Sequence, residues 1–272
     1  MAALIAYPLF QLFGNNDYRF ESWVTRSALL FLVLGLIPCF KYFDLNLRAL
    51  GHNNSFATFS KQASYGFAAG LLILGVVIFL LVFFDIRILA NDANLTLKLI
   101  LKALLAGLVV ALIEETLFRG LFFKLTKTWH NAFTAVFISS FFYAILHFIK
   151  PIEHIEQNLL NFNTGFEVIL NAFKGLAFMH LDDFLALFIV GVLLALVRLR
   201  TRTLSYCIGL HASWVFLIKI TKDLTDSNSS ANLAYFTGQY DGIIGALSFS
   251  WVTIISVIYL IYVIKPNYSH HS

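Results

Sequence analysis

Residues 97–125 read LKLILKALLAGLVVALIEETLFRGLFFKL, and this stretch indicates what class of protein the chain is. It is longer than the roughly 20 apolar residues that a helix needs to cross a bilayer. Nevertheless it carries Glu114, Glu115 and Arg119 in its interior. A charged side chain at the centre of a membrane helix costs about 2.5 to 3.5 kcal/mol, so such groups normally face protein or a wet cavity and mark function. The stretch therefore predicts a membrane helix with a functional site.

The composition of the whole chain agrees with a membrane protein. Of its 272 residues, 59% are hydrophobic and only 12% are charged, and the mean hydropathy is +0.79. This leaves too little polar surface to cover a soluble protein of this size. The net charge of +4 does not point to nucleic acid, because the basic residues lie at the ends of apolar stretches. We expect an all-α integral membrane protein in the cell membrane of a prokaryote, with lipid as its main partner.

Apolar stretches near bilayer length recur along the chain and predict a transmembrane helical bundle of about seven spans. They are residues 27–43, 66–86, 97–125, 132–149, 183–197, 204–220 and 242–264. Residues 1–13 are too short to cross and predict an interfacial or re-entrant helix, although an eighth span built partly from them stays open. Residues 151–181 predict an amphipathic surface helix, and residues 222–241 predict a loop.

The spans group into three regions and suggest an orientation. Residues 1–96 hold the N-terminal segment and two spans, residues 97–220 a catalytic membrane core, and residues 221–272 an external loop, the last span and a short tail. The run RLRTR at residues 198–202 is the densest basic cluster between spans. Because short cytoplasmic loops are enriched in Lys and Arg, we expect this loop to be cytoplasmic.

Helical spacing organises the charged groups of residues 97–125. Glu115 and Arg119 are four residues apart and can pair on one face, whereas Glu114 points about 100° away and can handle a proton. The same face continues as Ala103, Gly107 and Ala111, a ladder of small residues that lets another helix approach closely. A pair that only pins helices together is the alternative interpretation, but two adjacent glutamates are harder to explain that way.

Further polar groups fall on two later spans. Ser140, Tyr143 and His147 share one face of the next predicted helix, and His211 lies about 10 Å below the basic loop. Counted from the intervening turn, Glu114 and His147 lie at similar depths of about 21 and 26 Å. Six other histidines lie in or beside predicted loops, where a solvated surface role is favoured. They are His52, His130, His154, His180, His270 and His271.

Two carboxylates and two histidines inside membrane spans suit either of two chemistries. They can form a general-base centre that activates water, or a metal site built from a carboxylate and imidazoles. The sequence has no HExxH motif, no Cys pair and no Ser–His–Asp signature of an exposed nucleophile. Hydrolysis by activated water is therefore favoured over a covalent route.

Three motifs, taken in order, resemble the CPBP family of membrane proteases, which is related to type II CAAX prenyl endopeptidases and is also called the abortive-infection family. EETLFR at residues 114–119 is similar to the family's EExxxR, SSFFYAILH at residues 139–147 to its FxxxH, and HASWV at residues 211–215 to its third histidine motif. Each motif is weak alone, but their order within consecutive apolar segments is fairly specific. The resemblance covers roughly residues 101–218.

The resemblance implies an intramembrane endopeptidase that cuts a membrane-associated protein or peptide, in some members after a prenylated cysteine. It assigns Glu114 as the base that activates water, with assistance from Glu115 and Arg119. His147 and His211 would complete the water site, or, together with Glu114, a metal site for which Zn²⁺ is the candidate. Ser140 and Tyr143 would support the site.

Two departures from the family pattern leave other functions open. Tyr143 stands where the family usually has Phe, and Val215 stands where it often has Asn or Asp. The loss of a polar group at Val215 suits altered catalysis or a catalytically silent regulatory or immunity scaffold. An ion-coupled transporter would also bury Glu, Arg and His within its spans. Protease remains the favoured function.

Overall fold

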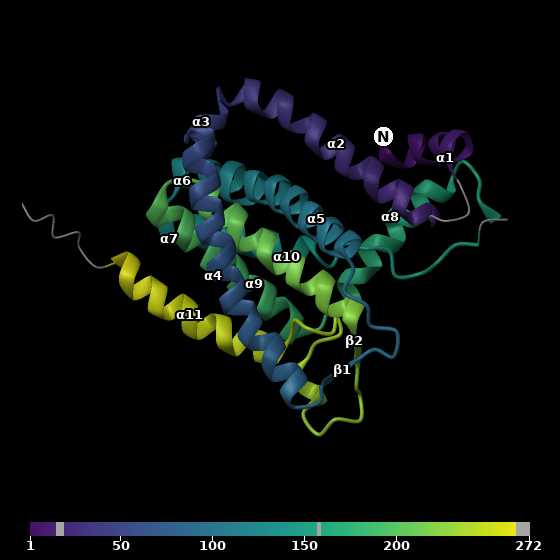
Figure 1. Ribbon diagram of the computed structural model, residues 1–272. Helices are drawn as coiled ribbons and strands as arrows, with labels where there is room; N and C mark the ends of the chain where they lie inside the picture. Colours follow the sequence, from purple (N-terminus) through teal and green to yellow (C-terminus); the bar gives the residue numbers. More distant parts are fainter. Residues whose placement is uncertain (15–18, 157–158, 265–272) are drawn as a thin grey trace, which may run out of the picture. The chain divides into compact units, whose positions relative to one another are not determined.

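The computed structural model describes residues 1–14, 19–156 and 159–264, and it is almost entirely helical (Figure 1). The predicted all-α bundle is thus confirmed. The chain divides into two compact units. The first unit comprises Met1–Asn46 and Ile145–Met179, and the second comprises Leu47–Ala144 and His180–Ser272.

The first unit is a small helical cluster. Its helices are α1 (Ala2–Phe13), α2 (Phe20–Tyr42) and α8 (Thr164–Lys174), and a 3-10 turn follows at Gly175–Phe178. Ala6, Phe20, Val24 and Val168 form its buried core, and the rings of Phe10 and Phe20 meet edge to face at 5.6 Å. The amphipathic helix predicted within residues 151–181 is α8, whose buried residues are Gly165, Val168 and Ala172 together with the polar Thr164 and Asn171.

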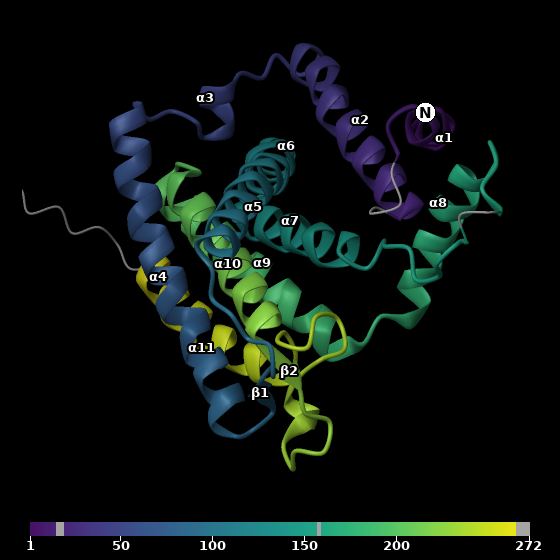
Figure 2. The ribbon, with the colours of Figure 1, turned by 45° about the vertical axis from the view of Figure 1, so that its right-hand side comes forward.

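The second unit contains the remaining helices (Figure 2). They are α3 (Leu47–Leu50), α4 (Phe56–Phe83), α5 (Leu97–Glu115), a π-helix η1 (Thr116–Phe122), α6 (Phe123–Trp129), α7 (Ala132–Leu146), α9 (Leu181–Thr201), α10 (Ser205–Leu224), the 3-10 turn η4 (Ala234–Phe236) and α11 (Ala246–Ile264). The prediction missed η1, which divides the stretch at residues 97–125 into three helical elements. It also placed the start of α4 ten residues late, because it missed the N-cap: the Ser55 hydroxyl accepts a hydrogen bond from Thr58 N at 3.4 Å.

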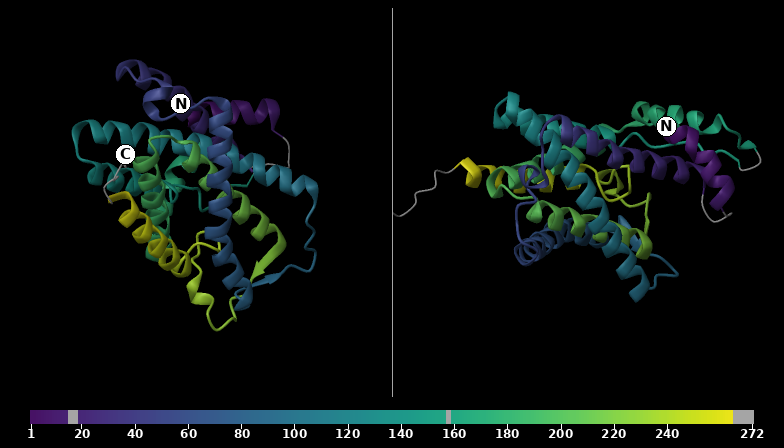
Figure 3. Two further views of the ribbon diagram at one scale, coloured as in Figure 1. Left: turned by 60° about the vertical axis from the view of Figure 1, so that its left-hand side comes forward. Right: turned by 90° about the horizontal axis from the view of Figure 1, so that it is seen from above.

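Helix α10 packs between α4 and α5, and α11 packs along α9 (Figure 3). Glycines permit the close approaches to α10. A Cβ atom added at Gly107 of α5 would lie 2.5 Å from the Ala212 carbonyl oxygen, and one added at Gly70 of α4 would lie 2.7 Å from the Leu210 carbonyl oxygen. Ala103 and Ala111 are buried together with Gly107 on α5. The predicted ladder of small residues therefore does bring a neighbouring helix close.

Residues 222–241 are not wholly a loop, contrary to the prediction. Helix α10 extends to Leu224, and β2 (Thr225–Ser227) then pairs antiparallel with β1 (Arg87–Leu89). The buried Arg87 guanidinium stabilises this ribbon by donating hydrogen bonds to Thr225 Oγ1 at 2.6 Å, Ser227 Oγ at 3.0 Å and the Gly242 carbonyl at 3.1 Å.

Each predicted span coincides with helical structure. Four helices are long and apolar enough to cross a membrane, namely α2, α4, α9 and α11. The other three predicted spans correspond to the α5–η1–α6 stretch, α7 and α10, so the total of seven stays a prediction. Residues 1–13 contain the predicted helix as α1, a short apolar helix, and its location at an interface also stays a prediction.

Candidate active site

The site is built around a π-helical segment of the second unit. Helix α5 ends at Glu115, and Thr116–Phe122 then continue as the wider π-helix η1. π-helical turns are rare and are frequent at functional sites, because the extra residue changes which side chains and carbonyls face inward. Glu115 and Arg119 are both completely buried here, and Arg119 Nη1 lies 3.1 Å from Glu115 Oε1. The pair expected from the spacing is therefore formed.

Three contacts besides the ion pair with Glu115 fix the position of Arg119. Its Nη2 donates a hydrogen bond to the Gly191 carbonyl of α9 at 3.3 Å, and its guanidinium lies 4.2 Å from the centre of the Tyr143 ring. The Arg119 backbone carbonyl accepts a hydrogen bond from Arg198 Nε at 3.3 Å. A guanidinium fixed in this way orients a neighbouring carboxylate, and it has little freedom to reach a substrate.

His211 of α10 lies against both glutamates. Its Nδ1 is 2.8 Å from Glu115 Oε1, and its Nε2 is 3.9 Å from Glu114 Oε2. Because the Arg119-paired carboxylate of Glu115 can only accept hydrogen bonds, the Nδ1 atom must carry a proton. The imidazole therefore directs Nε2 toward Glu114, and the edge-to-face contact with Tyr143 at 5.9 Å supports its ring.

The two glutamates differ in accessibility. The Glu115 side chain is 0% exposed and the Glu114 side chain is 27% exposed, although the residues are adjacent. Among the described residues, the buried Glu115 Oε2 atom accepts no hydrogen bond. Buried polar atoms normally have a hydrogen-bond partner in the protein or in water, so this oxygen can accept a hydrogen bond from a bound molecule. Glu114 is therefore the more exposed of the two carboxylates, although its Oε2 atom is buried.

The supporting residues from α7 have different surroundings. Tyr143 is buried and contacts both Arg119 and His211, as described above. The Ser140 hydroxyl instead donates to the Val136 carbonyl of its own helix at 2.7 Å. A Cβ atom added at Gly191 would lie 2.9 Å from both Cα and Cβ of Ser140, so α9 passes close to α7 at Ser140. His147 directly follows α7 and belongs to the first unit, so its part in the site stays a prediction.

Sequence reasoning missed three contributors to the site. Arg198 was counted only as a charge of the basic loop, but it is buried and joins η1 to the Leu50 carbonyl, which its Nη2 contacts at 3.1 Å. Gly191 was given no role. The solvated surface role expected of His52 is wrong, because its Nε2 lies 2.9 Å from the Thr116 hydroxyl at the start of η1. His270 and His271 lie outside the described residues.

The second unit contains two of the three side chains expected to hold zinc, Glu114 and His211, and the third, His147, belongs to the first unit. Catalytic zinc usually has three protein ligands and one open position. In the second unit, His211 Nε2 lies 3.9 Å from Glu114 Oε2, whereas Glu115 Oε1 contacts both Arg119 and His211. No group of three or more His, Cys, Asp or Glu side chains suited to a metal ion occurs in the described part of the chain. The zinc site expected from Glu114, His147 and His211 stays a prediction.

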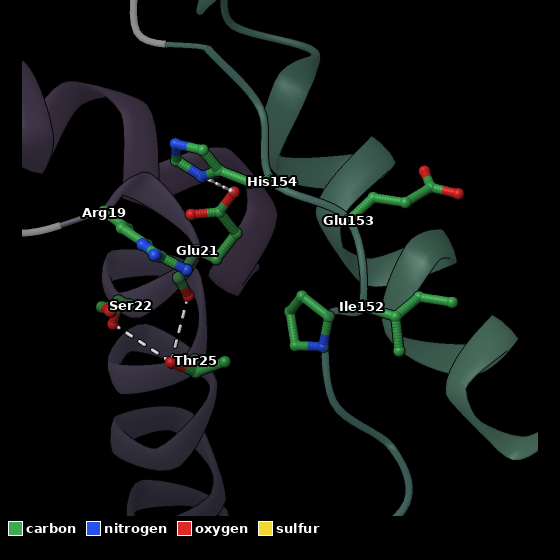
Figure 4. Close-up of a pocket in the computed structure, with 8 residues that line it drawn as sticks. Arg19, Glu21, Ser22, Thr25, Ile152, Glu153 and His154 are labelled. Carbon is green, nitrogen blue, oxygen red and sulfur yellow. Dashed lines mark hydrogen bonds and ion pairs between the residues drawn. The ribbon is translucent and has the colours of Figure 1, made fainter. Parts of the chain in front are cut away.

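The first unit has a polar pocket of its own, of 280 Å³, between the start of α2 and residues 151–154 (Figure 4). Glu21 and His154 point toward each other there, with Glu21 Oε1 at 2.9 Å from His154 Nδ1 and at 2.8 Å from Ile155 N. This carboxylate fixes the path of the chain after α7. Arg19 also lines the pocket. Because its side chain is basic, we do not describe this pocket as a second acidic or metal-binding site.

Comparison with known proteins identifies one related family. Residues 96–217 match the family model described as "Type II CAAX prenyl endopeptidase Rce1-like". The matched segment begins at the N-cap of α5 and ends within α10, so it includes Glu114, Glu115, Arg119, Tyr143 and His211. No curated protein and no solved structure matches the chain.

Proposed function

Because residues 96–217 match the family model of Rce1-like type II CAAX prenyl endopeptidases, we propose that this integral membrane protein hydrolyses a peptide bond in a membrane-associated protein or peptide. The observation that carries the proposal is the position of His211 between a buried glutamate and an accessible one. The description of the matching family names an endopeptidase, and four helices long and apolar enough to cross a membrane agree with a membrane location.

The proposed mechanism gives each carboxylate a separate task. Arg119 fixes Glu115, and Glu115 accepts a hydrogen bond from the protonated Nδ1 of His211. His211 Nε2 is then free of a proton and accepts a hydrogen bond from the attacking water. Glu114 removes a proton from this water as the water oxygen bonds to the peptide carbonyl carbon. The same proton passes from Glu114 to the leaving nitrogen as the carbon–nitrogen bond breaks. Protons therefore balance without a covalent intermediate on the enzyme.

A catalytically silent scaffold is the second candidate function, and the observation that favours it is Val215. This half-buried residue lies one turn after His211 on α10 and offers no polar group where the family often has one. In the proposed enzyme, the two glutamates and His211 activate the water without a polar group at position 215. In a scaffold, the same groups would only hold helices together.

Glu114→Gln separates the two functions, because it keeps the size of the side chain and removes the base. Membranes that contain wild-type protein or the variant are compared by quantitative analysis of new peptide ends, and cleaved candidates are then tested with purified protein in liposomes. We expect turnover to fall by about 10²- to 10⁴-fold, the usual contribution of general-base catalysis. Glu153→Gln is the matched control, because its side chain is 63% exposed and lies in the first unit.

Either of two results would overturn the proposal. Wild-type turnover by well-folded Glu114→Gln protein would remove the base from the mechanism, and no cleavage by wild-type protein would favour the scaffold. A chelator tests whether the protein groups act without a metal, because catalytic zinc usually needs three protein ligands and the second unit supplies two of the expected three. We expect cleavage to resist the chelator. Cleavage that the chelator abolishes and Zn²⁺ restores would make this a metalloprotease.

A further inference from the structure

A second pocket in the second unit, here called the basic pocket, lies apart from the glutamates. Its volume is 510 Å³, and its charged lining residues are Arg48, Lys124, Lys127, Arg198 and Arg202. Phe123, Leu199 and Thr128 also line it, whereas no acidic residue does. Cations at the end of α9 also suit the helix dipole, but that effect reaches only the last turn and accounts for neither Arg48 nor the lysines.

The basic residues come from three separate elements. Arg48 lies on α3, Lys124 and Lys127 lie on α6, and the two remaining arginines lie at the C-terminal end of α9. Among the described residues, none of the five forms an ion pair with an acidic side chain. Like charges gathered around one cavity repel one another, so an anion bound among them would lower the energy of the arrangement.

The position of the pocket at the end of a membrane helix and its lining residues indicate the chemical class of that anion. Helix α9 is one of the four helices able to span a membrane, and Arg198 and Arg202 lie at its end, where lipid headgroups are expected. Clusters of Lys and Arg at such positions attract anionic phospholipids. The exposed guanidinium groups of Arg48 and Arg202 offer the planar donor geometry that suits phosphate oxygens, and Phe123 and Leu199 give the pocket an apolar wall.

We propose that the basic pocket binds a phosphate group, supplied by the headgroup of an anionic phospholipid. Arg198 connects the pocket to the candidate active site, because its guanidinium also contacts the backbone carbonyls of Arg119 and Leu50. A bound phosphate would therefore hold α3, α6 and the end of α9 together around η1. This inference does not depend on the proposed peptidase activity.

The test measures stabilisation of the purified, delipidated full chain in an uncharged detergent. Short-chain phosphatidylglycerol, short-chain phosphatidylcholine and inorganic phosphate are titrated at constant ionic strength, and the melting temperature is recorded. A ligand that binds only the folded protein raises this temperature with saturation. We expect phosphatidylglycerol to raise it and phosphatidylcholine to have no effect. An equal rise with inorganic phosphate alone would support the same site with free phosphate as its ligand.

Two double variants that remove the same number of charges show whether the basic pocket is where the lipid binds. Lys124→Ala with Lys127→Ala removes two charges from the pocket, and Lys98→Ala with Lys102→Ala removes two from the start of α5. With each basic residue contributing its usual amount near an anionic lipid, the first pair should weaken binding about 30-fold. The control pair should bind as wild type does. Equal weakening in both pairs, or no stabilisation by either anion, would overturn the proposal.

Arg202→Gly removes a pocket charge without damaging the fold. Arg202 ends α9 with a φ of 58°, a left-handed conformation that glycine adopts at no steric cost. The variant should therefore be at least as stable as wild type without ligand, and yet respond more weakly to phosphatidylglycerol. An unchanged lipid response in this variant would count against the pocket even if the lysine pair failed to fold.

Discussion

At the scale of single residues, the site depends on the unequal surroundings of two adjacent glutamates. Glu115 is enclosed and shared by Arg119 and His211, whereas Glu114 is partly exposed. The difference arises because a helix turns neighbouring side chains about 100° apart, so that one faces the packed interior and the other the edge of the site. Glu115 can thus position its neighbours while the adjacent Glu114 takes part in the reaction.

Arg119→Ala should damage both the fold and the activity. It leaves Glu115 as a buried carboxylate without its compensating cation, which typically costs about 3 to 5 kcal/mol. Adding Glu115→Gln removes the uncompensated charge, so the double variant should recover part of the lost stability and none of the activity. Denaturant unfolding of the purified variants in detergent, together with turnover, checks both statements. An Arg119→Ala protein as stable as wild type would contradict the role assigned to the pair.

His52 should make the fold sensitive to mild acid. Burial, with Arg198 nearby, lowers the pKa of His52 below its ordinary value of 6.5. The unfolded chain then takes up a proton more readily than the folded protein, so stability is complete above pH 6.5 and falls as the pH decreases through the folded-state value. The Thr116 hydroxyl donates to the Leu112 carbonyl at 2.6 Å and therefore accepts from His52, and a glutamine amide can replace that donor.

The measurement compares the melting temperatures of wild type and His52→Gln from pH 7.5 to pH 5. Wild type should lose stability relative to the variant only below about pH 6.5. Parallel curves across the whole range would show that His52 does not titrate with folding. His130 provides the control, because its exposed ring in the second unit should give His130→Gln the same curve as wild type.

At the scale of elements, the sequence predicted well what depends on local spacing and poorly what depends on tertiary contact. The Glu115–Arg119 pair, the ladder on α5 and amphipathic α8 all follow from residues three or four apart. The π-helix does not, because its extra residue per turn is tolerated only where contacts such as Arg198 to the Arg119 carbonyl satisfy the displaced backbone. Arg198 itself lies 79 residues from Arg119, beyond the reach of any periodic pattern.

Gly191→Ala should separate α7 from α9 and loosen the site. The new methyl group at position 191 would lie 2.9 Å from Ser140 Cα. The carbonyl of residue 191 also accepts the hydrogen bond from Arg119 Nη2, so a shift of α9 would disturb Arg119. Overpacking of this kind usually costs about 1 to 3 kcal/mol, and turnover should fall with it. Gly75→Ala is the control, because nothing lies within 4 Å of its added Cβ. There the gain in helix propensity should stabilise the protein by about 0.5 to 1 kcal/mol. Melting temperatures of the two variants should move in opposite directions.

At the scale of the whole molecule, the orientation in the membrane is the largest open prediction. The RLRTR run covers the end of α9 and the turn into α10, and the positive-inside rule assigns it to the cytoplasm. A reporter inserted near Arg200 should therefore be cytoplasmic, and one inserted near Asp226, at the other end of α10, should be external. Exchanged signals would reverse the orientation while leaving the geometry of the site unchanged.

The Glu115–Arg119 pair also bears on how the chain is made. Its two members are four residues apart, so the pair can form while this one segment is still leaving the ribosome. A glutamate and an arginine that enter the bilayer already paired should escape part of the roughly 2.5 to 3.5 kcal/mol that each charge costs alone. His211 is synthesised 96 residues after Glu115. The nascent segment can thus carry Glu115 and Arg119 into lipid as a neutral pair, and the site is completed only when α10 arrives.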